Sequence, residues 1–260
     1  MKVGITLPTF TADRTLTVRA AKAATAAGLD GVFLFDHLWP MGSPGRPALA
    51  CLPGMAAVAV ATQRVIVGPL VARVGLLSDD WLIDGLNTVG VIAGPGRLLV
   101  GLGTGDRLSA AENVAYGLDV PPAEARLAHL GQLARQLVDA GKPVWIGGRS
   151  PAVRRLAAEV GVPVNMWGVP VDEVRAMSQP CTWGGQVLVG ADDAEAERLL
   201  KRYGGRPGLV HGSIRRVAEH CAELARAGVT WIVAAPLDVG DQPEVAVQNM
   251  AGVRQALALA

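Results

Sequence analysis

Three short segments combine residue types suited to acid–base chemistry or to anion binding. The first is Asp36-His37, which follows an apolar run. Histidine titrates near neutral pH and passes a proton in either direction, so the pair is a candidate for general acid–base catalysis. A hydrogen-bonded histidine in a solvated loop is the alternative for the same dipeptide.

The second segment is rich in glycine and ends in an acid. Gly103, Thr104, Gly105 and Asp106 follow another apolar run. Glycines let the backbone approach a flat ligand closely and offer N–H groups as donors. Asp106 has the chemistry of an acid or of a hydrogen-bond acceptor. An ordinary glycine-rich turn is the alternative.

The third segment, Gly147-Gly148-Arg149-Ser150, precedes a predicted helix. Exposed N–H groups, the positive end of a helix, an arginine and a hydroxyl together favour a phosphate group. Ser150 also fits a plain N-cap, with Pro151 as the first helical residue. The two roles are compatible.

Two further side chains are candidates for the same site. Arg73 lies near the end of an apolar run, where a cation is costly unless it pairs with an acid or reaches an anion. Trp39, two residues after His37, is a candidate for lining a substrate pocket. The remaining tryptophans are of a type more often found in the core than beside a ligand: Trp81, Trp145, Trp167, Trp183 and Trp231.

These segments follow strands in a regular alternation of strands and helices. The apolar runs predict strands at residues 3–7, 31–35, 65–71, 97–102, 143–146, 162–166, 186–189 and 230–235. Helices are predicted at residues 13–27, 48–63, 79–93, 121–140, 151–160, 171–178, 192–203, 213–227 and 243–258. Continuously apolar strands are typical of a parallel sheet covered on both faces.

Eight strand–helix units predict an α/β fold, a (β/α)8 TIM barrel, with a single domain spanning residues 1–260. Its active site is expected at the carboxyl ends of the strands, where the three segments fall. An open doubly wound sheet is the alternative. It favours a Gly-x-Gly-x-x-Gly turn after the first strand, which this sequence lacks.

The composition argues against several classes of partner. The chain has 24 basic and 23 acidic residues and a net charge of +1, unlike a dedicated binder of nucleic acid or of anionic membranes. No apolar run reaches the roughly 18 residues of a membrane span. Three widely spaced cysteines form no metal-binding cluster, so we expect no metal and reduced, buried thiols in a cytoplasmic protein.

The ordered set of segments resembles the bacterial luciferase-like family of flavin- and deazaflavin-dependent oxidoreductases. The resemblance rests on residues 3–8, 27–33, 61–68, 96–105, 143–151 and 227–233, which span nearly the whole chain in family order. The family fold is a (β/α)8 barrel that binds FMN or the deazaflavin coenzyme F420. Asp36-His37 resembles the F420-dependent branch, whereas luciferases tend to have Glu-His-His at that point.

The resemblance implies a role for each candidate residue. His37 would be the acid–base beside the reacting carbon, Asp36 would help to hold the cofactor, and Asp106 would lie near the deazaflavin. Residues 71–73 fall where the family often has a non-prolyl cis peptide. The cofactor-binding set would be Arg73, Gly103, Thr104, Gly105, Gly147, Gly148, Arg149 and Ser150.

The leading hypothesis is an enzyme that transfers a hydride between F420 and a small organic substrate. The alternatives are an FMN-dependent monooxygenase, a non-catalytic flavin- or deazaflavin-binding protein, and a phosphate-binding barrel enzyme unrelated to flavins. The chain is shorter than many family members around residues 168–185 and 190–212, where substrate-specificity elements often lie. The hydrophobic excess predicts a homodimer, with a buried face on the helices at residues 48–63 and 79–93.

Overall fold

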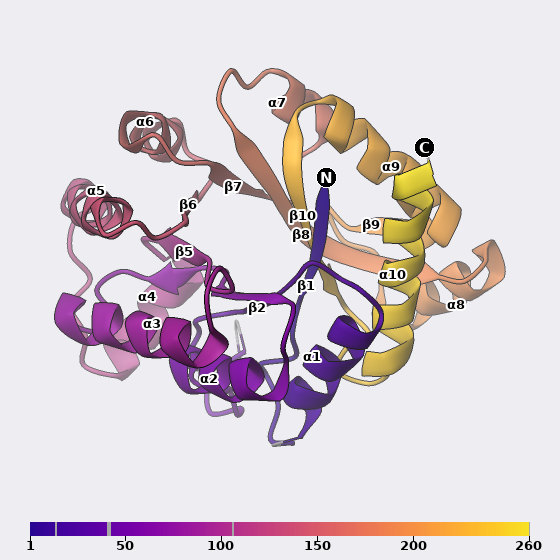
Figure 1. The fold of residues 1–260 in the computed structure, drawn as a ribbon, viewed down its shortest axis with the longest axis horizontal. Coiled ribbons are helices and arrows are strands. Elements are labelled where there is room, and N and C mark those ends of the chain that lie inside the picture. Colours follow the sequence, from indigo (N-terminus) through magenta and orange to yellow (C-terminus); the bar gives the residue numbers. More distant parts are fainter. Residues whose placement is uncertain (14, 41–42, 106, 260) are drawn as a thin grey trace.

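A ring of parallel strands surrounded by helices positions the candidate residues (Figure 1). The structure is a computed structural model that describes residues 1–13, 15–40, 43–105 and 107–259, without the side chains at 107 and 108. Ten strands and ten helices lie within these ranges. None of the described helices has the length and apolar character needed to cross a membrane.

The strands are β1 (Lys2–Thr6), β2 (Gly31–Leu34), β3 (Ile66–Pro69), β4 (Ala72–Arg73), β5 (Val100–Gly103), β6 (Val144–Gly147), β7 (Val164–Trp167), β8 (Cys181–Gly190), β9 (Val210–Ser213) and β10 (Val229–Pro236). The helices are α1 (Leu16–Ala26), α2 (Cys51–Ala61), α3 (Asp79–Ala93), α4 (Arg107–Ala115), α5 (Ala123–Asp139), α6 (Pro151–Val160), α7 (Val171–Arg175), α8 (Asp193–Tyr203), α9 (Ile214–Arg226) and α10 (Pro243–Leu259).

The described strands form eight positions around a barrel. Their order is β3-β2-β1-β10-β8-β7-β6-β5-β4, and all of these pairs are parallel. Strands β3 and β4 share one position, on either side of a cis peptide between Leu70 and Val71. A bridge between Val67 and Leu98 joins β3 to the chain leading into β5, so the ring closes. The predicted (β/α)8 barrel is confirmed.

Close backbone approach at Gly68 accompanies the closure of the ring. The Leu99 N–H donates to the Val67 carbonyl oxygen over 3.1 Å. A Cβ on Gly68 would overlap with the Leu99 carbonyl oxygen. Because the obstacle is backbone rather than a movable side chain, position 68 accepts only glycine without a shift of β3 or of the chain before β5.

Aromatic residues fill the barrel interior below the site. The Phe33 ring stacks on Trp145 at 5.6 Å between centroids, and both rings pack near Trp231. Trp183 is also buried. The prediction of a core role is confirmed for these tryptophans but is wrong for Trp81, which is 75% exposed on α3, and for Trp167, which is half-buried and lines a cavity.

Most predicted bounds differ from the observed ones by a few residues, and the largest differences are in one strand and in two elements outside the predicted set. Strand β8 begins at Cys181, five residues earlier than expected from residues 186–189, because Gly184 and Gly185 interrupt its apolar run. Two elements were not predicted from the sequence: β9, which pairs with β8 outside the ring, and α4. Helix α4 carries part of the candidate site.

The three cysteines were expected to be buried thiols. Cys51, Cys181 and Cys221 are all free and all buried. Burial raises the pKa of the Cys221 thiol to about 12. These thiols are therefore core residues rather than nucleophiles.

Candidate active site

A cavity of about 640 Å³ opens at the carboxyl ends of the barrel strands. Its wall includes the ends of β1, β2, β4, β5, β6 and β10, together with the first residues of α6. Ten of the predicted site residues line it: Asp36, His37, Arg73, Gly103, Thr104, Gly105, Gly147, Gly148, Arg149 and Ser150. Asp106, the predicted acid of the second segment, lies outside the described residues.

Trp39 does not lie in the wall of this cavity. Its side chain is buried, and its ring centroid lies 5.8 Å from that of Tyr116, just after α4. The ring packs beside Tyr116, and the assignment of Trp39 to a substrate pocket stays a prediction. The aromatic wall comes from Phe10, Phe35 and Trp167.

The aromatic wall reaches the candidate catalytic histidine. Phe10 stacks on Phe35 with centroids 5.9 Å apart and planes 4° from parallel, and Trp167 meets Phe35 edge-on. The centroid of Phe10 lies 6.1 Å from that of His37. An apolar surface beside an imidazole excludes water from the place where a proton would move.

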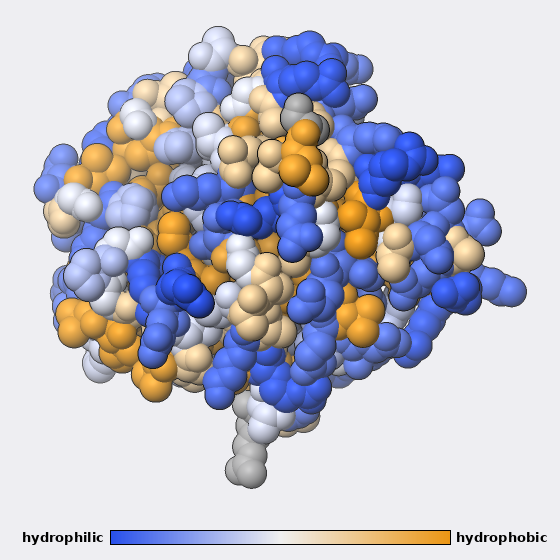
Figure 2. Space-filling view, turned by 45° about the vertical axis from the view of Figure 1, so that its right-hand side comes forward, coloured by the Kyte–Doolittle hydropathy of each residue, from blue (hydrophilic) through white to orange (hydrophobic). Residues whose placement is uncertain are grey.

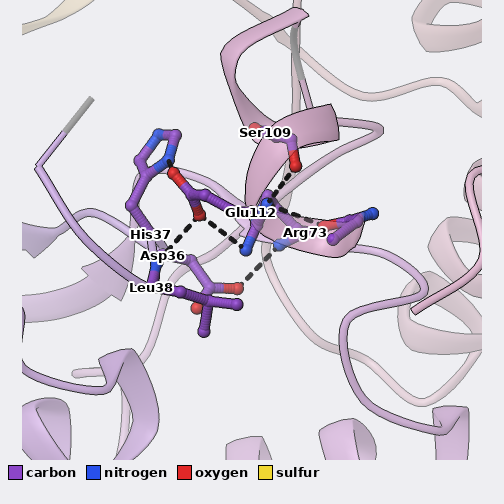
Figure 3. A network of polar contacts seen from close by, with 7 residues as sticks. Asp36, His37, Leu38, Arg73, Ser109 and Glu112 are labelled. Atoms are coloured by element: carbon purple, nitrogen blue, oxygen red, sulfur yellow. Dashed lines mark hydrogen bonds and ion pairs between the residues drawn. The ribbon is translucent and has the colours of Figure 1, made fainter. Parts of the chain in front are cut away.

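Glu112 of α4 holds His37 in position (Figure 3). Its side chain is fully buried, and its Oε1 lies 2.8 Å from the Nδ1 of His37. Its Oε2 accepts the backbone N–H of Leu38 over 2.8 Å and lies 3.0 Å from the Nη2 of Arg73. Both oxygens of one carboxylate therefore fix the segment that carries His37.

Arg73 is buried and already neutralised by protein groups. Its Nη1 donates to the Oδ1 of Asn113 over 3.1 Å and lies 3.5 Å from the Ser109 carbonyl oxygen. The ion pair to Glu112 offsets the guanidinium charge, while the Nε of Arg73 has no hydrogen-bond partner among the described residues. The arginine lines the cavity, and its side-chain partners in the protein lie on α4.

Asp36 is tied to β4 through the backbone. Its Oδ2 accepts the N–H of Arg73 over 2.9 Å. Burial raises the pKa of Asp36 above its ordinary value, while the hydrogen bond from Arg73 acts in the opposite direction. Asp36 thus fixes the end of β2 against β4.

The Val71 side chain leaves no room for a Cβ at two of the glycines that were predicted to bind the cofactor. A Cβ on Gly103 would lie 2.5 Å from Val71 Cγ2, and one on Gly147 would lie 2.8 Å from Val71 Cγ1. The glycines of β5 and β6 therefore make room for the Val71 side chain. Because Val71 also lines the cavity, the three residues together form an apolar part of its wall.

The phosphate candidate segment begins α6 as expected. The Ser150 hydroxyl accepts the Val153 N–H over 3.2 Å, so the predicted N-cap is confirmed. Arg149 is 57% exposed and its Nη2 lies 3.6 Å from Glu173. The segment brings a cation and a helix N-terminus to the cavity, which is the arrangement that favours an anion.

Glu112 is the site residue that could not be found from the sequence. It lies 75 positions after His37, in a helix whose sequence RLSAAENVA has no regular apolar face. Nothing in that stretch distinguishes a buried acid from a solvated one. The only available signal was the buried Arg73, which required an acidic partner that the sequence did not identify.

Asp238 is a buried acid with a raised pKa. Its sequence neighbours Leu237 and Val239 line the cavity. Burial raises its pKa to about 6, and Glu195 and Asp241 add to the effect. Its Oδ1 has no hydrogen-bond partner among the described residues. Ionising this group in the folded protein therefore costs stability.

We expect the free energy of unfolding of Asp238→Asn, relative to that of the wild-type protein, to be larger at pH 8 than at pH 4. The folded state binds the proton more tightly than the unfolded state, so stability falls as pH rises from about 4 to about 6. A rise of this pKa from 3.8 to about 6 corresponds to at most about 3 kcal/mol. Urea unfolding of both proteins at pH 4 and pH 8 measures the difference. An equal difference at the two pH values would contradict the assignment.

Sequence comparison finds relatives of this chain that are named F420-dependent glucose-6-phosphate dehydrogenases. An F420-dependent glucose-6-phosphate dehydrogenase from Nocardia farcinica is 30% identical over 248 residues, covering 89% of this chain and 67% of that protein. The F420-dependent glucose-6-phosphate dehydrogenase of Nakamurella multipartita is 36% identical over 130 residues, covering 50% of this chain and 36% of the relative. Several such relatives are matched over only about a third of their own length. No protein-family model matches the chain.

Two solved structures share the fold at low identity. An F420-dependent secondary alcohol dehydrogenase in complex with an F420-acetone adduct has a TM-score of 0.77 and 13% identity, covering 97% of this chain and 99% of that one. The oxygenating constituent of 3,6-diketocamphane monooxygenase from Pseudomonas putida, in complex with FMN, has a TM-score of 0.74 and 16% identity, covering 100% and 98%. The chain belongs to the bacterial luciferase-like family of flavin- and deazaflavin-dependent oxidoreductases.

Proposed function

We propose that this protein transfers a hydride between coenzyme F420 and a small organic substrate, with His37 as the acid–base. The observation that carries the proposal is the position of His37. Its Nδ1 is held by a buried carboxylate, and its ring lies in the wall of a 640 Å³ cavity. The activities for which the curated relatives are named support the same coenzyme.

The residues of the cavity fit a flat cofactor with an anionic tail. Val71, Gly103 and Gly147 offer an apolar surface without projecting side chains on the two strands. The other end of the wall carries Arg149 and Ser150 at the start of α6. When bound, F420 supplies the carbon that accepts or releases the hydride.

The protein's own residues would then orient the substrate and manage one proton. In the oxidation of an alcohol, the carbinol C–H bond breaks and its two electrons leave with the hydrogen as hydride. The hydroxyl proton passes to His37, and the carbon–oxygen double bond forms. The rings of Phe10 and Phe35 keep water from the imidazole.

A coenzyme assay tests this proposal. The purified chain is incubated with oxidised F420 and a panel of small alcohols, and the fall in coenzyme absorbance is followed. We expect at least one alcohol to reduce the coenzyme in a protein-dependent manner. Oxygen consumption with reduced FMN, and no reaction with F420, would favour an FMN-dependent monooxygenase instead.

We expect Arg149→Ala to weaken F420 binding by about five- to tenfold, because an exposed arginine contributes about 1 kcal/mol toward an anion. Arg154→Ala is the matched control, since Arg154 also pairs with Glu173 but does not line the cavity. Fluorescence titration gives both dissociation constants. Equal changes in the dissociation constant of F420 for the two variants would contradict a binding role for Arg149.

We also propose that two copies associate through α2 and α3. Val60 of α2 is 74% exposed, and Trp81 and Val91 of α3 are 75% and 83% exposed. Apolar residues gather on the lower left of the surface in Figure 2, on the side where α3 lies in Figure 1. A second copy of the same face would cover this apolar surface.

We expect Val91→Asp to shift the protein from dimer to monomer in sedimentation at micromolar concentration, since a charge in an apolar interface is costly. Val114→Asp on α4 is the control, because Val114 is 71% exposed on a helix that is not part of the proposed interface. A wild-type monomer under the same conditions would overturn the dimer.

We further propose that the chain is a single domain that works in the cytoplasm, in keeping with its three unpaired thiols.

A further inference from the structure

We infer that Glu112 sets the tautomer of His37, so that the imidazole carries its hydrogen on Nδ1 and presents a bare Nε2 to the substrate. The catalytic consequence rests on the proposed function, whereas the tautomer itself follows from the geometry. Glu112 is therefore a positioning residue. It acts through His37 and does not contact the reacting atoms.

The two oxygens of Glu112 have different surroundings (Figure 3). Oε2 receives the Leu38 N–H over 2.8 Å and faces the Nη2 of Arg73 at 3.0 Å. Oε1 faces the Nδ1 of His37 at 2.8 Å. A buried carboxylate that lies beside a cation and accepts a backbone N–H is in its ionised form, which offers only acceptors.

The partner of an ionised carboxylate must donate. The Nδ1 of His37 therefore carries a hydrogen, and in the neutral ring the Nε2 carries none. Nε2 has no hydrogen-bond partner among the described residues, and the ring lies in the cavity wall. The lone pair of Nε2 is thus the proton acceptor available to a bound alcohol.

The charge of Glu112 also suits the later state of the reaction. When the hydroxyl proton moves to Nε2, the imidazole becomes a cation 2.8 Å from the Glu112 carboxylate. A buried anion at that distance stabilises the cation. Before the proton moves, the ion pair with Arg73 stabilises the ionised form of Glu112. In the reverse direction the same pair returns the proton to the product oxygen.

The variant Glu112→Gln tests the inference by changing one atom. The position of Oε2 faces two donors, so the amide oxygen must occupy it and the amide NH2 must face His37. An NH2 group donates, so Nδ1 must be bare and the hydrogen must move to Nε2. We expect the ¹⁵N chemical shifts of the His37 ring to change from the Nδ1–H pattern to the Nε2–H pattern.

The rate should follow the tautomer. We expect kcat for alcohol oxidation to fall by about 10²–10⁴-fold in Glu112→Gln, the range for loss of general base catalysis, while F420 binding changes by less than about threefold. The control is Asp79→Asn, the same carboxylate-to-amide change beside a histidine, since Asp79 pairs with His129 outside the cavity. It should leave the His37 signals and the rate unchanged.

An Nε2–H pattern in the wild-type chain would overturn the inference without any variant. An unchanged His37 pattern in a folded Glu112→Gln protein would overturn it as well. A changed pattern with an unchanged rate would support the tautomer assignment and would count against His37 as the base of the proposed reaction. The two failures are therefore distinguishable.

Discussion

His37→Asn should reduce F420-dependent alcohol oxidation by about 10²–10⁴-fold, the usual contribution of a general base. Asparagine places an amide N–H near the position of Nδ1, so Glu112 keeps a donor and the buried network keeps its charge balance. It has no group that accepts a proton at the position of Nε2. The loss should therefore appear in kcat, with the dissociation constant of F420 within about threefold of wild type.

Single-turnover measurements with preformed coenzyme complex separate this effect from binding. A solvent-exposed histidine provides the control: His211→Asn lies on β9, outside the wall of the cavity, and should leave the rate unchanged. If His37→Asn keeps more than about a tenth of the wild-type rate, another group moves the proton, and the assignment of His37 fails.

Gly68→Ala should destabilise the fold by about 3 kcal/mol, at the upper end of the range for overpacking. The added Cβ would overlap with the Leu99 carbonyl oxygen at the closure of the barrel. Relief requires β3 to move away from the chain before β5, which weakens the hydrogen bond between Leu99 and Val67. Thermal or urea unfolding measures the loss, which corresponds to about 6–12 °C in Tm for a chain of this size.

Gly205→Ala is the matched control for this effect. A Cβ at Gly205 meets only Leu200 Cδ1, at 3.8 Å, and the backbone there is open to any residue. Its stability should stay within about 0.5 kcal/mol of wild type. Equal stability of the Gly68 and Gly205 variants would show that the approach of β3 to Leu99 is not needed for closure.

The barrel could be predicted from sequence because its strands are continuously apolar and are punctuated by glycine and proline. Residues 143–146 and 151–160 predict the strand and helix observed at β6 and α6, including the Ser150 cap. Helix α4 is not predicted because the buried side chains described in it include the polar residues Ser109 and Glu112. Periodicity of apolar residues predicts helices that bury an apolar face. It does not predict a helix whose buried side chains form ion pairs.

The site could be predicted where chemistry and position coincide. Asp36 and His37 follow β2, and the fold brings them to the cavity with Gly103, Gly148 and Ser150. The partners within the site depend on contacts between distant segments, such as the one between His37 and Glu112, and one sequence alone does not contain them. The proximity of Trp39 to His37 in sequence predicts a place in the pocket, whereas the described structure shows its ring beside that of Tyr116.

Equilibrium titration of the purified full chain with F420, and separately with FMN, tests the proposed coenzyme most directly. Quenching of tryptophan or coenzyme fluorescence gives both dissociation constants, with Trp145 and Trp167 among the tryptophans near the cavity. We expect F420 to bind at least about tenfold more tightly than FMN, a difference of about 1.4 kcal/mol. Tighter binding of FMN, or binding of neither cofactor, would contradict the proposed function.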